Sequence, residues 1–542
     1  MDAWFDTTIY LGLAAIADKR GDRPALIAGD DEITYDDLCG EARRLAAGLS
    51  ELGVSTGDTI GLWLSNRREW IATQLAASCL GVSVVAVNTR YRAHELEYML
   101  RDANCAALVT ESTFLDIDFL EILSSVVPSV GEVDPESFDP DSFPALEHVI
   151  TVDEGDGHPA TREYADVLDG GIDRDAIEPE TDPMAVASIF YTSGTTSDPK
   201  GCQQTNRSLI AHSHAVGEHL GLTGDDVSIG ALPFCGVLGY NALFSALTSG
   251  TPVVLQSHFD PAETIRLIDA HDVTFLNAIG AMYSRMIDDD GFDSDAMSSL
   301  RRAVVTFMNG FDATEFDRIE DAIGAPLVQP YGLSEANSQV FVGDPTDPRE
   351  QRKQVGGPLV DPGRQDARIV DPSTGSELPA GERGELQLNG YNVMTGYLNK
   401  PDQTQAAFTE DGWLRTGDLC HRDEQGYFYY HSRMDDTIRV RGFLVSPAEI
   451  ESAIQDHDAV VEAQVVGADH PHHGQVPVAF VVSRTEDFDV SDLETYLVDR
   501  IADYKRPAAI EFVDEFPRTE SPHGEKVQKG KLRERAGSVL GS

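Results

Sequence analysis

Strand-like and helix-like segments alternate regularly between Pro24 and Thr110. Helical periodicity runs through EARRLAAGLSEL, REWIATQLAASCLG and HELEYMLRDANC, and these are followed in turn by the strand-like runs DTIGLWLSN, VSVVAVNT and AALVTE. Strands separated by single helices of this length pair in parallel, because the chain must cross over before the next strand begins. A second alternation between Ala185 and about Pro330 has strand patterns in MAVASIFYTS, TPVVLQS, DVTFLNAI, RRAVVTFMN and APLVQPYG. Together they predict an α/β fold of doubly wound βαβ subdomains.

The remaining segments predict smaller units. A chain of 542 residues exceeds what one hydrophobic core can organise. After Gly356, short strands with TG and AG turn dipeptides indicate hairpins and a small β-barrel-like part. From about Thr437 the order helix, strand pair, helix and strand predicts a small α+β domain, carried by PAEIESAIQDH, VVEAQVVG, VPVAFVVS, VSDLETYLVDRI and AAIEFVDEF. Residues 128–182, rich in acidic residues, proline and glycine, are interpreted as a surface excursion without chemistry.

The chain is strongly acidic, with 92 acidic against 41 basic residues and a formal net charge of −51. Because the excess is spread along the whole sequence, it indicates a solvated acidic surface and not an acidic tail. Such a surface repels nucleic acid and anionic membranes, so neither is an expected partner. The composition favours a halophilic cytoplasm, where salt screens the repulsion, and an acidic protein from a mesophile is the alternative.

Cysteine and histidine spacings give no metal site or disulfide framework. The six cysteines form no CxxC pair, which favours free thiols in a reducing compartment. The N-terminal segment MDAWFDTTIYLGLAAIADKRGD lacks a secretory pattern, and no stretch approaches the roughly 18 apolar residues of a membrane span, so we expect a cytoplasmic protein. His470, His472 and His473 match no standard metal-ligand spacing and are interpreted as solvated side chains of a turn.

The segment YTSGTTSDPKG, residues 191–201, combines hydroxyl side chains, glycines and one lysine with almost nothing that could pack in a core. It follows a predicted strand and precedes the helical pattern NRSLIAHSHAVGEHL. Backbone amides, hydroxyls and an ammonium group in such a loop can surround phosphates. The spacing differs from the GxxxxGK[ST] of nucleotide hydrolases, which indicates another phosphate chemistry. A plain glycine turn is the alternative.

Three further motifs join this loop in chain order, namely YGLSE (331–335), WLRTGD (413–418) and SRMDDTIRVRGFLVSPAEIE (432–451). Together the four resemble the adenylate-forming superfamily of acyl-CoA synthetases, luciferases and nonribosomal adenylation domains. The resemblance covers Pro24 to Leu532, and four ordered motifs make it specific. It implies an N-terminal AMP-binding domain (residues 1–434), a small mobile C-terminal domain (residues 435–542) and a hinge at Asp435. It also implies ATP, Mg²⁺ and coenzyme A as cofactors.

The resemblance assigns roles in ATP binding. It implies that the glycine-rich loop holds the β- and γ-phosphates, that Tyr331 stacks on adenine and that Asp418 and Arg433 bind the ribose. Glu335 is implied as an oxygen ligand for Mg²⁺. Both Glu335 and Thr195 are implied as catalytic residues and as metal ligands. The implied nucleotide-binding residues are Thr192, Ser193, Gly194, Thr196, Lys200, Tyr331, Gly332, Ser334, Asp418 and Arg433. Ser197 departs from the family pattern by replacing a glycine that permits close backbone approach.

A lysine near the C-terminus is implied to neutralise charge during adenylation. In PRTESPHGEKVQKGKLRER the best match is Lys526, and Lys529 is the alternative, because Glu525 and a lengthened loop depart from the family pattern. In the family the C-terminal domain swings about its hinge between adenylation and thioester-forming poses, and Gly442 is implied to leave room for pantetheine. The implied reaction is attack of a carboxylate on the α-phosphate of ATP, loss of pyrophosphate and acyl transfer to coenzyme A.

The expected substrate pocket is uncharged. LPFCGVLGYN places Cys235 and Gly236 where many relatives carry an aromatic residue and a histidine, and it lacks the aspartate with which amino-acid-activating relatives pair the substrate ammonium. NAIGAMYS and FMNGF add the pocket residues Asn277, Gly280, Asn309 and Gly310. Because no second cation is offered to a dicarboxylate, we expect an apolar aliphatic or aromatic monocarboxylate.

Two alternatives stay open at this point. Ser197 and Glu525 motivate a catalytically impaired acyl- or nucleotide-binding relative instead of an active ligase. The sequence is also compatible with a homodimer. The remaining expected partners are small molecules: the carboxylic acid, ATP and coenzyme A.

Overall fold

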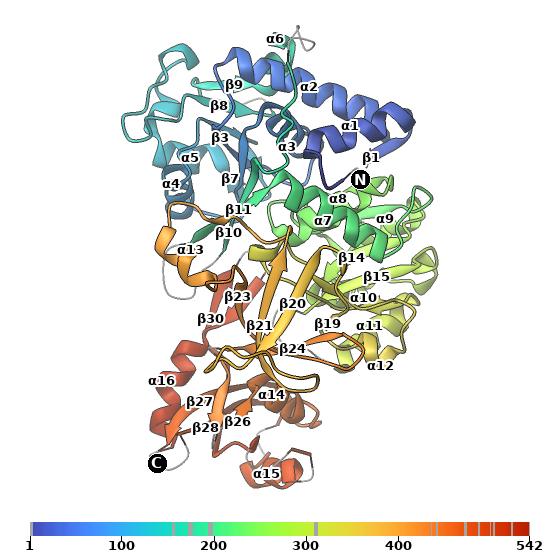
Figure 1. Ribbon diagram of the computed structural model, residues 1–542, viewed down its shortest axis with the longest axis vertical. Helices are drawn as coiled ribbons and strands as arrows, with labels where there is room; N and C mark the ends of the chain where they lie inside the picture. Colours follow the sequence, from blue (N-terminus) through green and yellow to red (C-terminus); the bar gives the residue numbers. More distant parts are fainter. Residues whose placement is uncertain are drawn as a thin grey trace.

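The computed structural model describes residues 4–153, 158–171, 177–192, 199–307, 313–434, 436–440, 443–470, 474–485, 488–498, 500–501, 505–521 and 524–540. The molecule is elongated, with the elements of the first half of the chain at one end and the C-terminal elements at the other (Figure 1). An antiparallel β-region lies between them. This order along the long axis follows the order along the sequence.

The first alternating region supplies the central strands β4, β3 and β5 of an eight-stranded sheet. Its order is β22-β11-β10-β4-β3-β5-β8-β9, parallel from β10 to β9, with β11 and β22 added antiparallel at one edge. The strands are β3 (Thr59–Trp63), β4 (Ser83–Ala86), β5 (Ala107–Thr110), β8 (His148–Thr151), β9 (Thr161–Glu163), β10 (Val186–Thr192), β11 (Lys200–Thr205) and β22 (Gly396–Tyr397).

Five strands of the second region, joined by β1 and β2 from the start of the first region, build a seven-stranded sheet in the order β16-β15-β14-β12-β13-β1-β2. All neighbours are parallel except the hairpin between β1 and β2. The strands are β1 (Pro24–Ala28), β2 (Asp31–Thr34), β12 (Ser228–Gly230), β13 (Val253–Leu255), β14 (Phe275–Ile279), β15 (Arg302–Thr306) and β16 (Leu327–Val328). Because β14, β15 and β16 are parallel, their carboxyl ends share one edge.

Helices cover both sheets, as strands connected by single helices require. They are α1 (Ile9–Arg20), α2 (Tyr35–Glu51), α3 (Arg68–Leu80), α4 (Ala93–Asp102), α5 (Phe119–Val126), α6 (Tyr164–Gly170), α7 (Asn206–His219), α8 (Val237–Thr248), α9 (Pro261–Ala270), α10 (Gly280–Ile287), α11 (Ala313–Ile323), α12 (Arg349–Arg352) and α13 (Pro401–Ala407). The start of α2 is fixed by a capping box, in which the Thr34 hydroxyl accepts from the Asp37 backbone amide while the Asp37 carboxylate accepts from that of Thr34.

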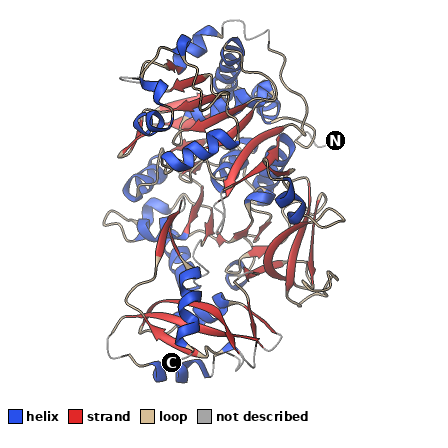
Figure 2. Ribbon diagram, turned by 90° about the vertical axis from the view of Figure 1, so that its left-hand side faces the viewer, coloured by secondary structure: helices blue, strands red, loops and turns tan. Residues whose placement is uncertain are grey.

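The buried side chains divide these elements into layers. Ile60 and Leu62 of β3 pack in a core shared by both sheets and by α1, α2, α3, α7 and α8, whereas Trp63 packs with α4 and α5 on the opposite face. A further core joins the outer face of the seven-stranded sheet to α9, α10 and α11. Helices therefore lie between and outside the two sheets, and Figure 2 shows this alternation of strands and helices. Burial on both faces explains why the strands read as continuous apolar runs.

The turn-rich region forms a five-stranded antiparallel sheet, and the tail forms a separate α+β unit. The first sheet has the order β19-β24-β23-β21-β20 and contains β19 (Gly356–Gly357), β20 (Gln365–Val370), β21 (Gly384–Gly390), β23 (Leu414–Arg422) and β24 (Phe428–Arg433). The tail contains β25 (Ile438–Val440), β26 (Phe443–Val445), α14 (Pro447–Gln455), β27 (Val460–His470), β28 (Gly474–Ser483), α15 (Val490–Val498), β29 (Ala509–Phe512), β30 (Arg518–Ser521), β31 (Gly524–Val527) and α16 (Lys529–Val539). Among the described residues, its hydrophobic clusters contain no side chain of the larger part.

Short elements complete the description, namely β6 (Thr113–Phe114), β7 (Ile117–Asp118), β17 (Pro330–Tyr331), β18 (Phe341–Val342), η1 (Pro128–Gly131), η2 (Pro135–Ser137), η4 (Ser294–Met297) and η5 (Ser334–Ala336). Across the described part of the chain, no helix is long and apolar enough to cross a membrane.

Most of the expected elements are present, and three expectations need correction. Residues 128–182 are not a plain surface excursion, because β8 and β9 extend the first sheet and α6 packs in the shared core. The strand in MAVASIFYTS opens the second alternating region but joins the first sheet, beside β4. The run APLVQPYG divides into β16 and β17, which belong to different sheets. Each correction concerns strand pairing, which periodicity within a segment does not encode.

Candidate active site

Asp418, Arg433 and Tyr331 meet in one polar cluster. Asp418 on β23 and Arg433 on β24 are direct cross-strand partners, and the Arg433 Nη1 lies 3.2 Å from the Asp418 Oδ1. The Tyr331 hydroxyl donates to the other carboxylate oxygen, Oδ2, at 2.5 Å. Arg433 also donates to the Thr416 carbonyl at 3.0 Å. The fold thus joins three of the four sequence motifs at one point.

Burial dominates the electrostatics of this cluster. Asp418 is 3% exposed, and burial raises its pKa to about 6, even though Arg433 and the Tyr331 hydroxyl favour the charged form. Conversely, the Asp418 carboxylate raises the pKa of Arg433. At neutral pH the site therefore holds a buried, ionised carboxylate beside a guanidinium group. Such a carboxylate is a strong acceptor for hydroxyl donors of a ligand.

Tyr331 itself is 6% exposed, and its ring centroid lies 5.7 Å from that of Phe341 and 5.6 Å from that of Tyr430. Burial and Asp418 raise its pKa well above the ordinary value, so the hydroxyl keeps its proton and remains a donor. The ring is consequently fixed by packing and by one short hydrogen bond.

Glu335 lies in a second polar group beside this cluster. It is in η5, and its Oε1 accepts a hydrogen bond of 2.8 Å from the Tyr397 hydroxyl. The Lys200 ammonium lies 4.9 Å from the centroid of the Tyr397 ring, because β11 and β22 pair there with Cys202 opposite Tyr397. A cation and a carboxylate thus flank one tyrosine.

Helix α4 holds both ends of the glycine-rich loop. Thr192 and Lys200 are the last paired residues of β10 and β11, so the strands deliver the two ends of the loop side by side. The Tyr98 hydroxyl donates to the Pro199 carbonyl at 3.0 Å, and the Tyr191 hydroxyl donates to Asp102 Oδ2 at 2.7 Å. The loop residues Ser193, Gly194, Thr195, Thr196 and Ser197 lie outside the described residues.

The segment that follows YGLSE has an unusual backbone. Asn337, Ser338 and Gln339 have φ values of 59°, 61° and 35°, a left-handed run that costs energy in residues with side chains. Gly332 lies against it, and a Cβ added there would stand 2.3 Å from the Gln339 backbone nitrogen. Only glycine therefore fits at position 332 without a backbone shift. The segment is anchored by His212, whose Nε2 donates to the Ser338 carbonyl at 2.8 Å.

His212 is a neutral anchor and not a titrating group. It is fully buried, and burial lowers its pKa to about 4. Its Nδ1 accepts from the Gln365 side-chain amide at 2.9 Å, which is consistent with a proton on Nε2. The strained segment is thus fixed to α7 and β20 by hydrogen bonds that persist at neutral pH.

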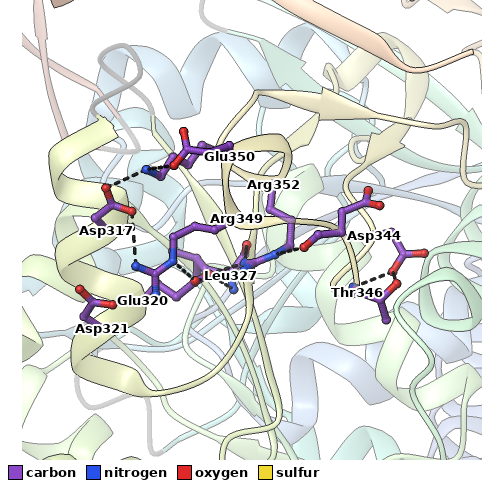
Figure 3. Close-up of polar contacts among 11 residues, drawn as sticks. Asp317, Glu320, Asp321, Leu327, Asp344, Thr346, Arg349, Glu350 and Arg352 are labelled. Carbon is purple, nitrogen blue, oxygen red and sulfur yellow. Dashed lines mark hydrogen bonds and ion pairs between the residues drawn. The ribbon is translucent and has the colours of Figure 1, made fainter. Parts of the chain in front are cut away.

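An ion-pair network holds the strand that leads to Tyr331 (Figure 3). Glu320 on α11 accepts from the Leu327 amide at 2.9 Å, and Arg352 on α12 donates to the Leu327 carbonyl at 2.7 Å. Arg352 and Arg349 also pair with Glu320 itself. Burial alone would raise the pKa of Glu320, but its hydrogen bonds with Arg352, the Leu327 amide and Arg349 outweigh burial and lower the pKa. The network clamps β16 just before β17.

The described residues of the expected acyl pocket come together only in part. Gly236 is the N-cap of α8, with φ −97°, and Cys235 is buried in the core, where burial raises its pKa to about 11. Asn277 lines a cavity of about 10 Å³ together with Phe234, which precedes α8, and Gly239, which lies in α8. Gly280 lies against Phe307, since a Cβ added to it would stand 2.5 Å from the Phe307 ring. Asn309 and Gly310 are outside the described residues.

The two candidate lysines lie in the C-terminal part. Lys526 is in β31, where its backbone pairs with Thr519 of β30. Lys529 begins α16, and its ammonium donates to Glu451 Oε1 at 2.8 Å. Glu451 is 7% exposed and also accepts from the Val465 amide at 2.8 Å. Lys529 is therefore engaged within its own domain. Asp435 and Gly442 lie outside the described residues.

Sequence reasoning missed the residues that support the site. Tyr397, Gln204, Tyr98 and Asp102 were not singled out, yet Tyr397 contacts Glu335, and Gln204 donates to the Ser334 carbonyl at 2.7 Å. The dipeptide Gly396-Tyr397 in a turn-rich stretch was an available signal for Tyr397. Within the described residues, no group of three or more His, Cys, Asp or Glu side chains could hold a metal ion.

Comparison with known proteins matches the whole chain. The family model "AMP-binding enzyme" matches residues 13–398, and "AMP-binding enzyme C-terminal domain" matches residues 449–522. A 2-succinylbenzoate–CoA ligase of Bacillus subtilis is 30% identical over 524 residues, covering 96% of both chains. The mitochondrial medium-chain acyl-CoA ligase ACSF2 of Danio rerio is 29% identical over 552 residues, covering 99% of this chain and 89% of its own. The crystal structure of ATP-bound MatB from Rhodopseudomonas palustris has a TM-score of 0.83 at 26% identity, covering 100% of both chains.

Proposed function

We propose that this chain, which belongs to the AMP-binding enzyme family and is an AMP-forming acid–thiol ligase, activates an apolar aliphatic or aromatic monocarboxylate. In this reaction the carboxylate displaces pyrophosphate from ATP to give an acyl-adenylate. The thiol of coenzyme A then attacks the acyl carbon, and AMP leaves. No protein nucleophile is required, so the buried cysteines take no part.

The observation that carries the proposal is the joining of Tyr331, Asp418 and Arg433, beside Glu335, from motifs far apart in the sequence. Asp418 would accept hydrogen bonds from the ribose hydroxyls, with Arg433 reaching the same sugar, and Tyr331 would supply an aromatic surface to adenine. Gly332 and Ser334 would contribute backbone to the same nucleotide site. These roles are supported by the burial and charge of the cluster.

The phosphates would lie at the end of β10 and β11. Thr192 and Lys200 frame the loop there, and we assign the β- and γ-phosphates to the backbone amides and hydroxyls of residues 193–196 with the Lys200 ammonium. When bound, Mg²⁺ would neutralise phosphate charge, with Glu335 as a carboxylate ligand and Thr195 beside it. One carboxylate suffices, because Mg²⁺ takes its other ligands from phosphates and water.

The two steps would use different faces of the C-terminal domain. Lys526 would neutralise the charge that develops at the α-phosphate and carboxylate during adenylation. Lys526 is preferred to Lys529 for this role, because the Lys529 ammonium is already engaged by Glu451. Asp435 would be the hinge between residues 1–434 and 435–542, and Gly442 would admit pantetheine in the second pose.

The substrate and setting follow from charge. Cys235, Gly236, Asn277 and Gly280 bring no charged group to the expected acyl pocket, and Asn309 and Gly310 would extend it, which favours a monocarboxylate with an apolar body. The net charge of −51 supports a halophilic, cytoplasmic setting. A homodimer is compatible with this assignment.

Release of pyrophosphate with a panel of straight-chain and aromatic acids, measured in molar KCl with and without coenzyme A, tests the proposal. We expect release that depends on an acid and turns over only when coenzyme A is present. Binding of ATP or acid without pyrophosphate release would instead support a catalytically impaired relative.

A further inference from the structure

The short segment from Met394 to Leu398, which contains β22, is bonded to two parts of the candidate site at once. The Met394 amide donates to the Glu335 carbonyl at 2.8 Å. The Leu398 amide donates to the carbonyl of Gly201, the residue after Lys200, at 2.8 Å. In Figure 1 the segment leads into α13, drawn in orange beside β10 and β11. The backbone beside the proposed Mg²⁺ ligand and the backbone beside the proposed phosphate-binding lysine are therefore held by one piece of chain.

Tyr397 is fixed at the centre of this segment. Its amide donates to the Thr404 hydroxyl of α13 at 2.9 Å, and its backbone pairs with Cys202 of β11. Two residues earlier, the Thr395 amide donates to the Gln203 carbonyl of β11 at 3.0 Å. Bonds on both sides of the segment thus leave the backbone of Tyr397 little freedom to move.

The Tyr397 side chain contacts both charged groups. Its hydroxyl donates to Glu335 Oε1 at 2.8 Å, and its ring centroid lies 4.9 Å from the Lys200 ammonium. The face of an aromatic ring attracts a cation, and a hydroxyl donor attracts a carboxylate, so one side chain can hold charges of opposite sign. Within the described part of the chain, Lys200 and Glu335 form no ion pair with each other.

The separation of these two charges matters for the proposed function. Lys200 and Glu335 are both half-buried, and opposite charges attract more strongly there than in bulk water. A direct ion pair would neutralise both groups and would have to break before ATP and its metal ion bind. Contact of each group with Tyr397 instead leaves the lysine for phosphate and the carboxylate for the metal.

The Glu335 carboxylate has one engaged oxygen and one that is open to a ligand. Oε1 accepts from Tyr397, whereas no residue that the structure describes donates to Oε2. A hydrogen bond to one oxygen fixes the rotation of the carboxylate and leaves the other oxygen for a cation. This arrangement fits Mg²⁺, which takes one or two carboxylates together with phosphates and water. Replacing a hydrogen-bond partner of a metal-binding side chain typically costs about 10- to 100-fold in metal affinity.

We propose that Tyr397 is a positioning residue that keeps the Glu335 carboxylate and the Lys200 ammonium apart, so that the first can meet Mg²⁺ and the second the phosphates of ATP. This inference rests on the proposed function and deepens the description of its nucleotide site. In this role Tyr397 acts through its two neighbours and not on the reacting atoms. The hydroxyl positions Glu335 and the ring positions Lys200, so the two contacts can be removed one at a time.

Binding of ATP in the absence of an acid separates the two contacts, when titration calorimetry is carried out in molar KCl with Mg²⁺ and again with a chelator. Tyr397→Phe keeps the ring and loses the hydroxyl. It should weaken binding of Mg²⁺-ATP by about 10- to 100-fold and change binding of metal-free ATP by less than about threefold. Equal affinity of wild type and Tyr397→Phe for Mg²⁺-ATP would overturn the inference.

Tyr397→Leu loses both contacts and should also weaken binding of metal-free ATP, by about threefold or more, because Lys200 is then held by no ring. Equal affinities of Tyr397→Leu and Tyr397→Phe for metal-free ATP would overturn the part of the inference that concerns Lys200.

Tyr429→Phe is the matched control. Tyr429 is also half-buried, and its hydroxyl donates to Asp423 Oδ2 at 3.1 Å, at the opposite end of β24 from Arg433. Both phenylalanine variants lose one hydrogen bond to a carboxylate and should lower the unfolding temperature by similar amounts. Only Tyr397→Phe should lose affinity for Mg²⁺-ATP. An equal loss of affinity in the control would indicate general loosening of the fold and overturn the positioning role.

A double variant tests whether Tyr397 acts through Glu335. Glu335→Gln alone should weaken binding of Mg²⁺-ATP, and Tyr397→Phe should add little to this loss, because the effects of two residues in one contact are not additive. Fully additive losses would contradict the inference.

A failure of the proposed function is recognised separately, because these measurements need no acid. If wild type releases pyrophosphate with an acid but Tyr397→Phe binds Mg²⁺-ATP as well as wild type does, the function stands and the inference fails. If Tyr397→Phe loses affinity for Mg²⁺-ATP but no acid supports pyrophosphate release by wild type, the inference stands and the function fails. A wild type that binds no ATP would overturn both.

Discussion

Replacing Asp418 by asparagine should stabilise the protein while weakening nucleotide binding. Asp418 is 3% exposed, and burial raises its pKa from 3.8 to about 6. Between these pH values the unfolded chain releases its proton before the folded chain does, so stability falls as the pH rises through this window. The difference corresponds to about 3 kcal/mol, all of which is lost by pH 7. Asparagine cannot ionise and escapes this loss.

We therefore expect Asp418→Asn to raise the free energy of unfolding at pH 7 by up to about 3 kcal/mol, and to change it little near pH 4. Urea unfolding in molar KCl at several pH values measures both. The control is Asp411→Asn, because Asp411 is an exposed carboxylate whose pKa is lowered to about 2 by its hydrogen bonds with Arg368 and Thr409. That variant should show no gain between pH 4 and 7.

The same variant should bind AMP more weakly, by about tenfold or more, because a neutral amide accepts hydroxyl donors less strongly than a carboxylate. In wild type, AMP affinity should rise with pH through about 6 and then level off. Titration calorimetry at each pH checks this. A variant that is less stable than wild type at pH 7, or that binds AMP equally well, would refute the account of this cluster.

Four further outcomes are expected. Lys526→Ala should slow acyl-adenylate formation by several orders of magnitude yet spare thioester formation from supplied acyl-adenylate. Lys529→Ala should chiefly lower stability. The reverse pattern in half-reaction assays would exchange the roles of the two lysines. Tyr98→Phe removes one hydrogen bond at the end of the glycine-rich loop and should raise the KM for ATP without changing thioester formation, and equal loss in both half-reactions would indicate misfolding. The unfolding temperature should rise steeply between about 0.1 M and a few molar KCl, and a flat response would remove the halophilic interpretation. Gly236→His should discriminate against the largest acids by about 1 to 3 kcal/mol in kcat/KM per excluded methylene, while a uniform loss across acids would remove Gly236 from the pocket.

The structure favours the pocket explanation in the last of these tests. Gly236 has a φ of −97°, which any residue adopts, so a side chain there does not strain the backbone of the turn. Gly332 differs, because the Gln339 backbone occupies the space that a Cβ would need. Glycine is therefore required at position 332 by a close backbone contact, whereas the backbone conformation does not require it at position 236.

Local patterns were enough to predict the parallel sheets. Alternating burial on β3, with Ile60 and Leu62 on one face and Trp63 on the other, is a direct consequence of strand periodicity. The same patterns did not predict which strands pair with each other. β10 could join either sheet on periodicity alone, and its partner β4 lies about one hundred residues earlier in the chain.

The candidate site divides in the same way. Asp418 and Tyr331 stand in motifs and could be found, whereas the bond from Tyr98 to Pro199 joins positions 101 residues apart and leaves no local pattern. The amide of Gln339 has no hydrogen-bond partner among the residues that the structure describes, and the sequence does not indicate this, because whether a glutamine has partners depends on the packing around it. Supporting residues of a site are therefore identified by their contacts and not by motifs.

The central claim is that the acid is activated as an adenylate, and transfer of oxygen tests it most directly. With an accepted acid labelled by ¹⁸O in its carboxylate, attack on the α-phosphate leaves one carboxylate oxygen on the phosphorus when coenzyme A takes the acyl group. Mass spectrometry of the products should find one ¹⁸O in each AMP and none in the pyrophosphate. Label in inorganic phosphate, or unlabelled AMP formed together with acyl-CoA, would contradict the account.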